Sequence, residues 1–120
     1  MTADGPFRRG EVVWGLGPFK ELEEDDPDPE RPFLVLSNKT HPFASQQFAG
    51  VAISTTERDV AYTLAPEDWY VGGLPEQSFV HPWSLVTRDH ADIVAVYGRL
   101  KLDTVDEVLE QLIGYLSAQK

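Results

Sequence analysis

The hydrophobic pattern of the chain changes once, close to its C-terminal end, and this change restricts the folds available to it. Up to about residue 100 the apolar residues form short runs rich in β-branched and aromatic side chains, separated by glycine, proline and acidic residues. Beyond that point they recur at the i, i+3, i+4, i+7 spacing of one helix face. The sequence therefore predicts a mainly β chain with a C-terminal α-helix, folded as a small, strongly bent barrel.

Two of the predicted strands carry irregularities. Gly50 marks a bulge or sharp bend, and Pro82 makes its strand bent or edge-like. The run after Arg31 is continuously apolar, which indicates a strand buried on both faces, with Trp14 of the first strand expected in the core. Trp69 and Tyr70 are expected near loop or bend positions. The predicted strands cover residues 10–16, 32–38, 46–55, 60–64, 78–87 and 93–100.

The C-terminal helix is predicted to start with a capping box. The stretch "TVDE", residues 104–107, has the hydroxyl and carboxylate spacing of that motif. Glu107 and Glu110 fall on the side that faces water. The predicted apolar face consists of Val105, Val108, Leu109, Leu112, Ile113 and Leu116.

Length and composition bound the organisation of the chain. Its 120 residues contain no internal repeat and fit one domain over residues 1–120. No run approaches the ~18 apolar residues of a membrane span, so no membrane partner is predicted. The N-terminus "MTADGPFRRGEVV" lacks the apolar stretch of a secretory signal, which favours the cytoplasm. The absence of cysteine excludes disulfides and thiolate metal sites.

The charge of the chain allows two interpretations. The sequence has 20 acidic and 10 basic residues and a formal net charge of −10. This balance argues against a nucleic-acid partner, because such binding normally depends on basic patches. The alternative is adaptation to high salt in a halophilic organism, where the Debye length falls to ~3 Å and the sign of the charge predicts partners poorly.

Residues 17–30 are predicted to form an acidic surface loop. This stretch contains three prolines, and seven acidic residues follow position 20. Such a composition buries little apolar area, so we expect a loop that leads directly to Arg31 and the strand behind it.

Five blocks of the sequence, in the same order and at suitable spacing, resemble the MazF/PemK family of toxin endoribonucleases. They are "RRGEVVWG", "ERPFLVLSN", "VAIST", "SFVHPWSLVT" and "GRLKLDTVDEVLEQLIGYL", of which "RPFLVLS" is the most diagnostic. The resemblance runs from about residue 8 to the C-terminus. It implies an SH3-like barrel of the MazF/PemK/CcdB type, a homodimer, and sequence-specific, metal-independent cleavage of single-stranded RNA. It also implies restraint by an antitoxin protein.

The resemblance implies a catalytic pair. The family's arginine falls on Arg31, and its threonine falls on Ser54, with Thr55 next to it; serine departs from the family pattern but keeps the hydroxyl. Metal-free RNA cleavage uses the adjacent 2′-hydroxyl as nucleophile, so the protein must hold the phosphate and stabilise its developing charge. A guanidinium and a hydroxyl can donate the hydrogen bonds for this. Arginine is a poor base, and the general base stays unassigned.

The remaining candidates have alternative interpretations. Arg8 and Arg9 bind substrate phosphate or only solvate a chain terminus. Trp83 stacks an unpaired base or packs in a core or dimer contact. No metal or cofactor is predicted, because the histidines lack the spacing and companions of a metal site and are expected to be structural or at the surface. They are His41, His81 and His90.

Two functional hypotheses remain open for Arg31. In the first it is the catalytic cation of an endoribonuclease, and the acidic loop swings clear of the RNA or occupies the groove as an inhibitor mimic. In the second it is an ordinary strand-edge arginine paired with Glu30 or Asp28. The chain is then a non-catalytic binding module on the same barrel, which inhibits a protein target or acts in regulation.

Overall fold

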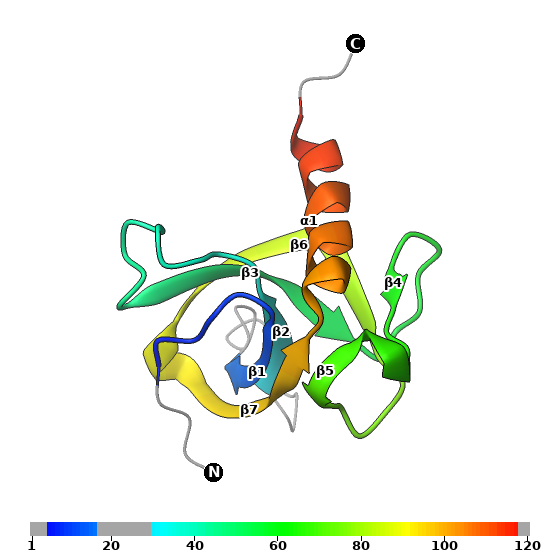
Figure 1. The fold of residues 1–120 in the computed structure, drawn as a ribbon, viewed down its shortest axis with the longest axis horizontal. Coiled ribbons are helices and arrows are strands. Elements are labelled where there is room, and N and C mark those ends of the chain that lie inside the picture. The colour runs from blue at the N-terminus through cyan, green and yellow to red at the C-terminus, as the bar shows by residue number, and fades with distance from the viewer. Residues whose placement is uncertain (1–4, 17–29, 118–120) are drawn as a thin grey trace, which may run out of the picture.

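The structure is a computed structural model that describes residues 5–16 and 30–117. One antiparallel sheet of seven strands, in the order β4-β6-β3-β2-β1-β7-β5, curls into a half-barrel beside a C-terminal helix (Figure 1). This confirms the predicted fold class. The predicted acidic loop lies outside the described residues except for Glu30. The strands are β1 (Glu11–Leu16), β2 (Glu30–Val35), β3 (Gln47–Ser54), β4 (Tyr62–Thr63), β5 (Trp69–Gly72), β6 (Phe79–Asp89) and β7 (Ile93–Leu100), and the helix is α1 (Leu102–Leu116).

Both faces of the sheet are buried. One face packs against α1, and the cluster there includes Leu34 together with Val105 of the helix. The opposite face carries a second cluster, which includes Phe33 and Val35. Because successive strand residues point to opposite faces, the consecutive residues 33–35 enter different clusters, and all of them are almost fully buried. This double burial explains why the run after Arg31 is apolar without alternation.

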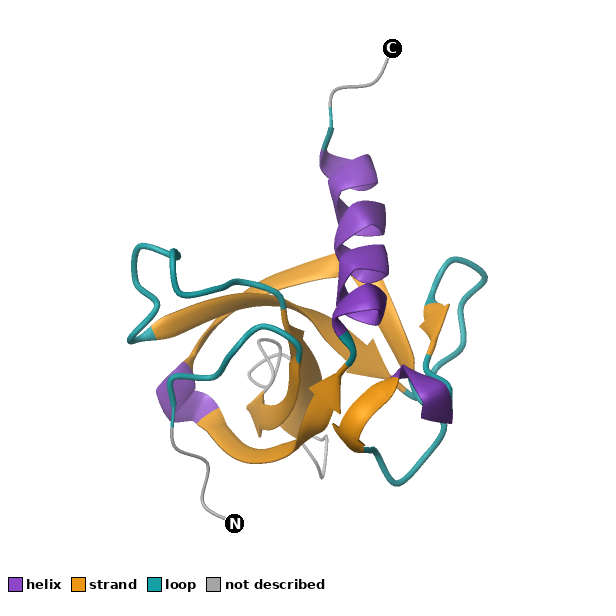
Figure 2. Cartoon of the chain, viewed as in Figure 1, coloured by secondary structure: helices purple, strands orange, loops and turns teal. Residues whose placement is uncertain are grey.

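The start of α1 corrects a prediction. Lys101 is the N-cap residue, Leu102 is the first helical residue, and no side chain caps this end. The predicted capping box is wrong, because the Thr104 hydroxyl lies inside the helix and donates to Oδ1 of Asp68 at 2.9 Å. Asp68 belongs to a short 3₁₀ helix, η1 (Pro66–Asp68). A second 3₁₀ helix, η2 (His90–Asp92), precedes β7, and besides α1 these two are the helical elements of the described residues (Figure 2).

The apolar face of α1 is buried in its first turns and exposed in its last. Val108 and Leu112 pack into the core, as predicted. Ile113 and Leu116 are 52% and 67% exposed, against the prediction. The reason is that the C-terminal part of the helix projects past the sheet (Figure 1).

Two short strands differ from the prediction. Trp69 and Tyr70, expected near loop or bend positions, belong to β5, which pairs with β7 at one edge of the sheet. The ring of Trp69 packs on the main core cluster, whereas Tyr70 is exposed beneath the guanidinium of Arg99, 4.8 Å from the ring centroid. At the other edge, β4 is limited to Tyr62 and Thr63.

The irregularity predicted at Pro82 is present, whereas Gly50 itself keeps regular pairing with Val35 on β2 and Val86 on β6. A Cβ atom on Gly50 would lie 2.3 Å from the backbone oxygen of Leu34, so glycine permits the close approach of β3 to β2. The β3–β6 register shifts between Val51 and Ala52, and the residues passed over on β6 include Pro82. This bulge bends β6 around one side of the pocket described next.

Candidate active site

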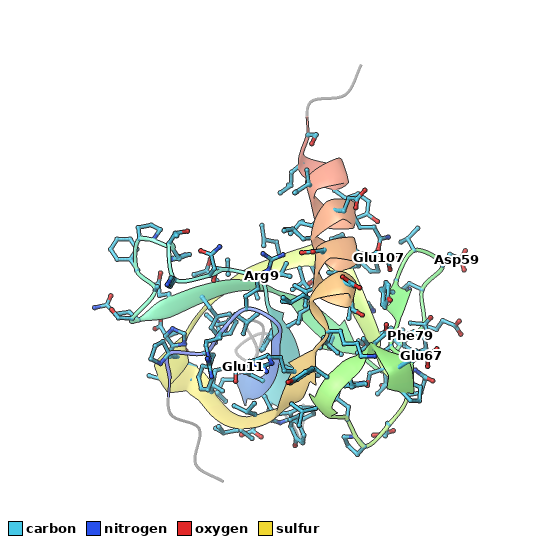
Figure 3. The ribbon with its side chains drawn as sticks, in the orientation of Figure 1. Arg9, Glu11, Asp59, Glu67, Phe79 and Glu107 are labelled. Atoms are coloured by element: carbon cyan, nitrogen blue, oxygen red, sulfur yellow. The ribbon has the colours of Figure 1, made fainter. Side chains whose placement is uncertain are left out.

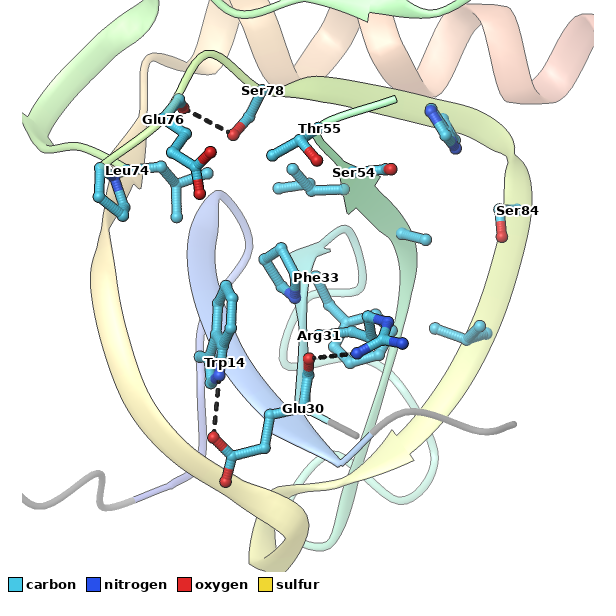
Figure 4. Close-up of a pocket in the computed structure, with 16 residues that line it drawn as sticks. Trp14, Glu30, Arg31, Phe33, Ser54, Thr55, Leu74, Glu76, Ser78 and Ser84 are labelled. Carbon is cyan, nitrogen blue, oxygen red and sulfur yellow. Dashed lines mark hydrogen bonds between the residues drawn. The ribbon is translucent and has the colours of Figure 1, made fainter. Parts of the chain in front are cut away.

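An open pocket of about 420 Å³ lies where the start of β2, the end of β3 and the bulged part of β6 meet. Figure 4 shows Arg31 from β2 and Ser54 and Thr55 from the end of β3 around this opening. The structure therefore brings together the three residues predicted to be catalytic. The other lining residues used below are Trp14, Glu30, Phe33, Ala52, Glu76 and His81.

The strand register explains why Arg31 and Ser54 share this pocket. The antiparallel pairing of β2 and β3 places Phe33 opposite Ala52. Arg31 lies two residues before Phe33 on β2, and Ser54 lies two residues after Ala52 on β3. Because the strands are antiparallel, Arg31 and Ser54 lie at the same end of the pair and on the same face of the sheet. The guanidinium of Arg31 is half-buried and donates from Nη1 to the backbone oxygen of Glu30 at 2.8 Å. This bond fixes one side of the guanidinium plane at the base of the pocket.

The hydroxyl of Ser54 is oriented by the turn that follows β3. Its Oγ accepts a hydrogen bond from the backbone N–H of Thr56 at 2.9 Å. Because the oxygen accepts from the chain, the hydroxyl hydrogen is available for donation elsewhere. Thr55 lines the same pocket and is exposed. Ser54 is thus the better ordered of the two hydroxyls.

Trp14 and Glu30 form a second polar contact in the pocket. The indole Nε1 of Trp14 donates to Oε1 of Glu30 at 3.0 Å (Figure 4). Trp14 is half-buried and lines the pocket, whereas the sequence predicted a core position. The ring also meets that of Tyr97 edge-on, with centroids 5.4 Å apart. Through this contact the indole holds the carboxylate of Glu30, which points away from the guanidinium of Arg31 (Figure 4).

His81 lies in the same pocket, and sequence reasoning assigned it no function. It is paired with Ala52 across the β3–β6 ladder. Its ring stacks on the indole of Trp83, with centroids 4.6 Å apart and an angle of 13° between the planes. Trp83 itself is 40% exposed. His81 could have been found as a pocket residue only from its position opposite Ala52. That position depends on the pairing of β3 with β6, which the sequence around His81 does not reveal.

Arg8 and Arg9 line a different pocket, together with Lys39. Nη2 of Arg9 (Figure 3) forms a 2.6 Å ion pair with Oδ1 of Asp106 on α1. The backbone N–H of Arg8 donates to the carboxylate of Glu11 at 2.5 Å. The structure therefore does not bring these two arginines together with Arg31.

Two further features concern metals and membranes. Among residues 5–16 and 30–117, no group of three or more histidine, aspartate or glutamate side chains is arranged to hold a metal ion. In the same part of the chain, no helix has both the length and the apolar character that a membrane span requires.

The fold and the pocket define a small β half-barrel protein that presents one guanidinium and adjacent hydroxyls in an open pocket. The family model described as PemK-like, MazF-like toxin of type II toxin-antitoxin system matches residues 8–116. The chain belongs to this toxin family. No curated protein matches it by sequence.

Solved structures with similar folds include endoribonucleases and a MazE-MazF complex. An endoribonuclease from Mycobacterial species has a TM-score of 0.69 and 19% identity, covering 94% of this chain and 92% of that chain. An endoribonuclease in complex with its cognate antitoxin, also from Mycobacterial species, has a TM-score of 0.62 and 17% identity, covering 95% of this chain and 96% of that chain. MazE-MazF from Deinococcus radiodurans has a TM-score of 0.68 and 18% identity, covering 97% of this chain and 100% of that chain. At these identities the likeness shows the fold.

Proposed function

We propose that the chain is a metal-independent endoribonuclease that cleaves single-stranded RNA at preferred sequences and acts as the toxin of a toxin–antitoxin pair. The observation that carries this proposal is the convergence of Arg31 and Ser54 in one pocket of a chain from this family. RNA is cut in the cytoplasm, so we place the protein there. The antitoxin partner is supported by similar folds whose structures contain one.

The proposed chemistry assigns a role to each residue. The substrate's 2′-hydroxyl attacks the adjacent phosphorus, the bond to the 5′-oxygen breaks, and the products carry a 2′,3′-cyclic phosphate and a 5′-hydroxyl. Arg31 holds the non-bridging phosphate oxygens with its N–H groups and stabilises the charge that builds on them. The hydroxyl of Ser54, with Thr55 beside it, donates a further hydrogen bond to the same oxygens. This mechanism needs no metal ion to generate the nucleophile.

Other parts of the proposal concern substrate contacts and assembly. The exposed indole of Trp83 stacks a base next to the scissile phosphate. Arg8 and Arg9, in their separate pocket, contact RNA phosphates beyond the cleavage site. We also propose a homodimer, which is consistent with the exposed apolar residues at the end of α1, Ile113 and Leu116.

A non-catalytic binding module is the second candidate, and one observation favours it. The carboxylates of Glu30 and Glu76 line the same pocket as Arg31. Negative charge there opposes the approach of a phosphate backbone, most strongly at low salt. Such a pocket would suit a protein target better than RNA.

A cleavage assay separates the two candidates. Wild-type protein, Arg31→Ala and the control Arg58→Ala, an exposed arginine outside the pocket, are incubated with a long unstructured RNA in EDTA, in dilute buffer and in ~1 M KCl. We expect discrete cuts with 5′-hydroxyl ends from wild type and Arg58→Ala. Arg31→Ala should be slower by roughly 10²–10³-fold, as for loss of a preorganised donor. Absence of RNA cleavage by all three proteins at both salt concentrations would refute the nuclease and favour the binding module.

A further inference from the structure

The proposed reaction requires a proton acceptor that Arg31 and Ser54 do not provide. The 2′-hydroxyl must lose its proton as it attacks, and a guanidinium stays protonated at all physiological pH values. Among the described residues that line the pocket, the candidate acceptors are Glu30, Glu76 and His81. One oxygen of Glu30 already accepts from Trp14. Imidazole is the side chain whose proton affinity suits general-base catalysis near neutral pH.

The strand register places His81 close to the proposed catalytic pair. On β3, Ala52 lies two residues before Ser54 and therefore points to the same face of the sheet. His81 is the partner of Ala52 on β6, as Phe79 is the partner of Ser54. Opposite residues of an antiparallel pair share a face, so His81 and Ser54 are diagonal neighbours on the face that opens into the pocket.

The contacts of the imidazole fix its tautomer. Nε2 lies 3.2 Å from the backbone oxygen of Thr56. A carbonyl oxygen only accepts, so Nε2 must carry the hydrogen, and in the neutral ring Nδ1 then holds a lone pair. Within residues 5–16 and 30–117, no hydrogen bond occupies Nδ1 of His81. Stacking on Trp83 restricts rotation of the ring.

The same short turn holds both proposed reactive groups. The backbone N–H of Thr56 donates to the hydroxyl of Ser54, and its backbone oxygen accepts from His81. The two ends of one residue therefore set the positions of the hydroxyl and the imidazole relative to each other. This link fixes the position of His81 relative to Ser54, which an isolated surface histidine would lack.

We infer that His81 is the general base of the proposed cleavage, an inference that rests on the function proposed above. Nδ1 takes the proton of the 2′-hydroxyl as the 2′-oxygen bonds to phosphorus. The bond from phosphorus to the 5′-oxygen breaks with its electron pair, and that oxygen takes a proton from water. The imidazolium then returns its proton to solvent. Arg31 and Ser54 stabilise the charge on the phosphate oxygens during this step.

The pH dependence of cleavage follows from this role. A general base acts only in its unprotonated form, so the cleavage rate should fall in acid. The other charged groups that face the pocket are Arg31 and Glu30 from β2 and Glu76 from the loop before β6. A mutation of the base must therefore change the pH profile itself, besides the rate.

His81→Gln tests the inference, because glutamine keeps an N–H donor for Thr56 but supplies no base. We expect its cleavage rate to fall ~10²–10⁴-fold and to lose the acid limb of the pH profile. Binding of an RNA with 2′-deoxy substitutions should be unchanged. His41→Gln, in the loop between β2 and β3 and outside the pocket, should retain wild-type activity and profile. A His81→Gln protein that cuts within threefold of wild type, or keeps the acid limb, would overturn the inference.

Two controls keep the result unambiguous. Cleavage by wild type and not by Arg31→Ala, with full activity of His81→Gln, would refute the role of His81 and leave the nuclease intact. Absence of cleavage by the wild-type protein would refute both the nuclease and the role of His81. If His81→Gln does not fold, the tautomer of His81 in the wild-type protein, read from long-range ¹H–¹⁵N NMR correlations, decides: hydrogen on Nε2 supports the inference, and hydrogen on Nδ1 overturns it.

Discussion

The indole of Trp14 donates a 3.0 Å hydrogen bond to the carboxylate of Glu30, the residue that precedes Arg31. This contact keeps a negative charge in the pocket where the phosphate is proposed to bind. For the proposed RNA substrate, a negative charge at this position opposes the approach of the phosphate. The salt adaptation suggested by the composition stays a prediction.

Glu30→Gln is expected to tighten RNA binding. The amide oxygen can still accept from Trp14, while one negative charge is removed from the lining of the pocket. A gain of ~1 kcal/mol, roughly fivefold in Kd at low salt, is reasonable for one half-screened charge. Fluorescence anisotropy with a 2′-deoxy-substituted RNA measures it. Glu110→Gln on the exposed side of α1 is the matched control, and equal affinities of the two variants would contradict the prediction.

Substitutions of the two hydroxyl residues identify which one assists Arg31. Ser54→Ala removes the hydroxyl ordered by Thr56 and should lower kcat by roughly 10–10²-fold with little change in KM. Ser54→Thr restores the hydroxyl and should recover most of the activity. Thr55→Ala, at the exposed position, should remain within a few-fold of wild type. Single-turnover cleavage measures all three, and a larger loss for Thr55→Ala would reverse the assignment.

The parts of the fold that depend on local pattern were predictable. The apolar run 33–35, the bend at Pro82 and the apolar period of α1 each reflect burial or backbone restriction along one segment. The structure places Arg31 and Ser54 in one pocket, and their catalytic role stays a prediction.

The missed features depend on contacts between distant segments. The hydroxyl of Thr104 resembles a helix cap in sequence, but Asp68 of η1 accepts its hydrogen bond instead. The strand β5 is short and is stabilised by pairing with β7, so its own sequence gives a weak signal. His81 gains its place from the β3–β6 register, which no local pattern around it reveals.

Two glycines provide a matched test of the packing. Gly50→Ala would place a Cβ atom 2.3 Å from the backbone oxygen of Leu34 and must push β3 from β2. We expect a loss of ~2 kcal/mol or more in the free energy of unfolding. Gly114→Ala meets nothing within 4 Å and lies inside α1, so it should stabilise by ~1 kcal/mol. Urea unfolding measures both, and a stabilised Gly50→Ala would refute the close approach.

The hydrogen-bond cluster around Asp68 predicts a loss of stability in alkali. The hydroxyl of Tyr62 donates to Oδ1 of Asp68 at 3.0 Å. Burial, and then the hydrogen bond and charge of Asp68, raise the pKa of Tyr62 from 10.0 to about 12. Between these values the unfolded chain releases a proton that the folded chain keeps, so the folded state loses stability as the pH rises from 10 to 12.

Tyr62→Phe tests this dependence. The variant lacks the ionisable hydroxyl, and its stability should change less than that of wild type between pH 10 and 12, the interval between the ordinary and the raised pKa. At neutral pH it should be less stable by ~1 kcal/mol, because Asp68 loses one of its donors. Thr104→Val removes the other hydroxyl donor to Asp68 but leaves Tyr62 able to ionise, so it should keep the alkaline slope. Urea midpoints measured across this pH range decide the point, and identical slopes for Tyr62→Phe and wild type would exclude Tyr62 as the source.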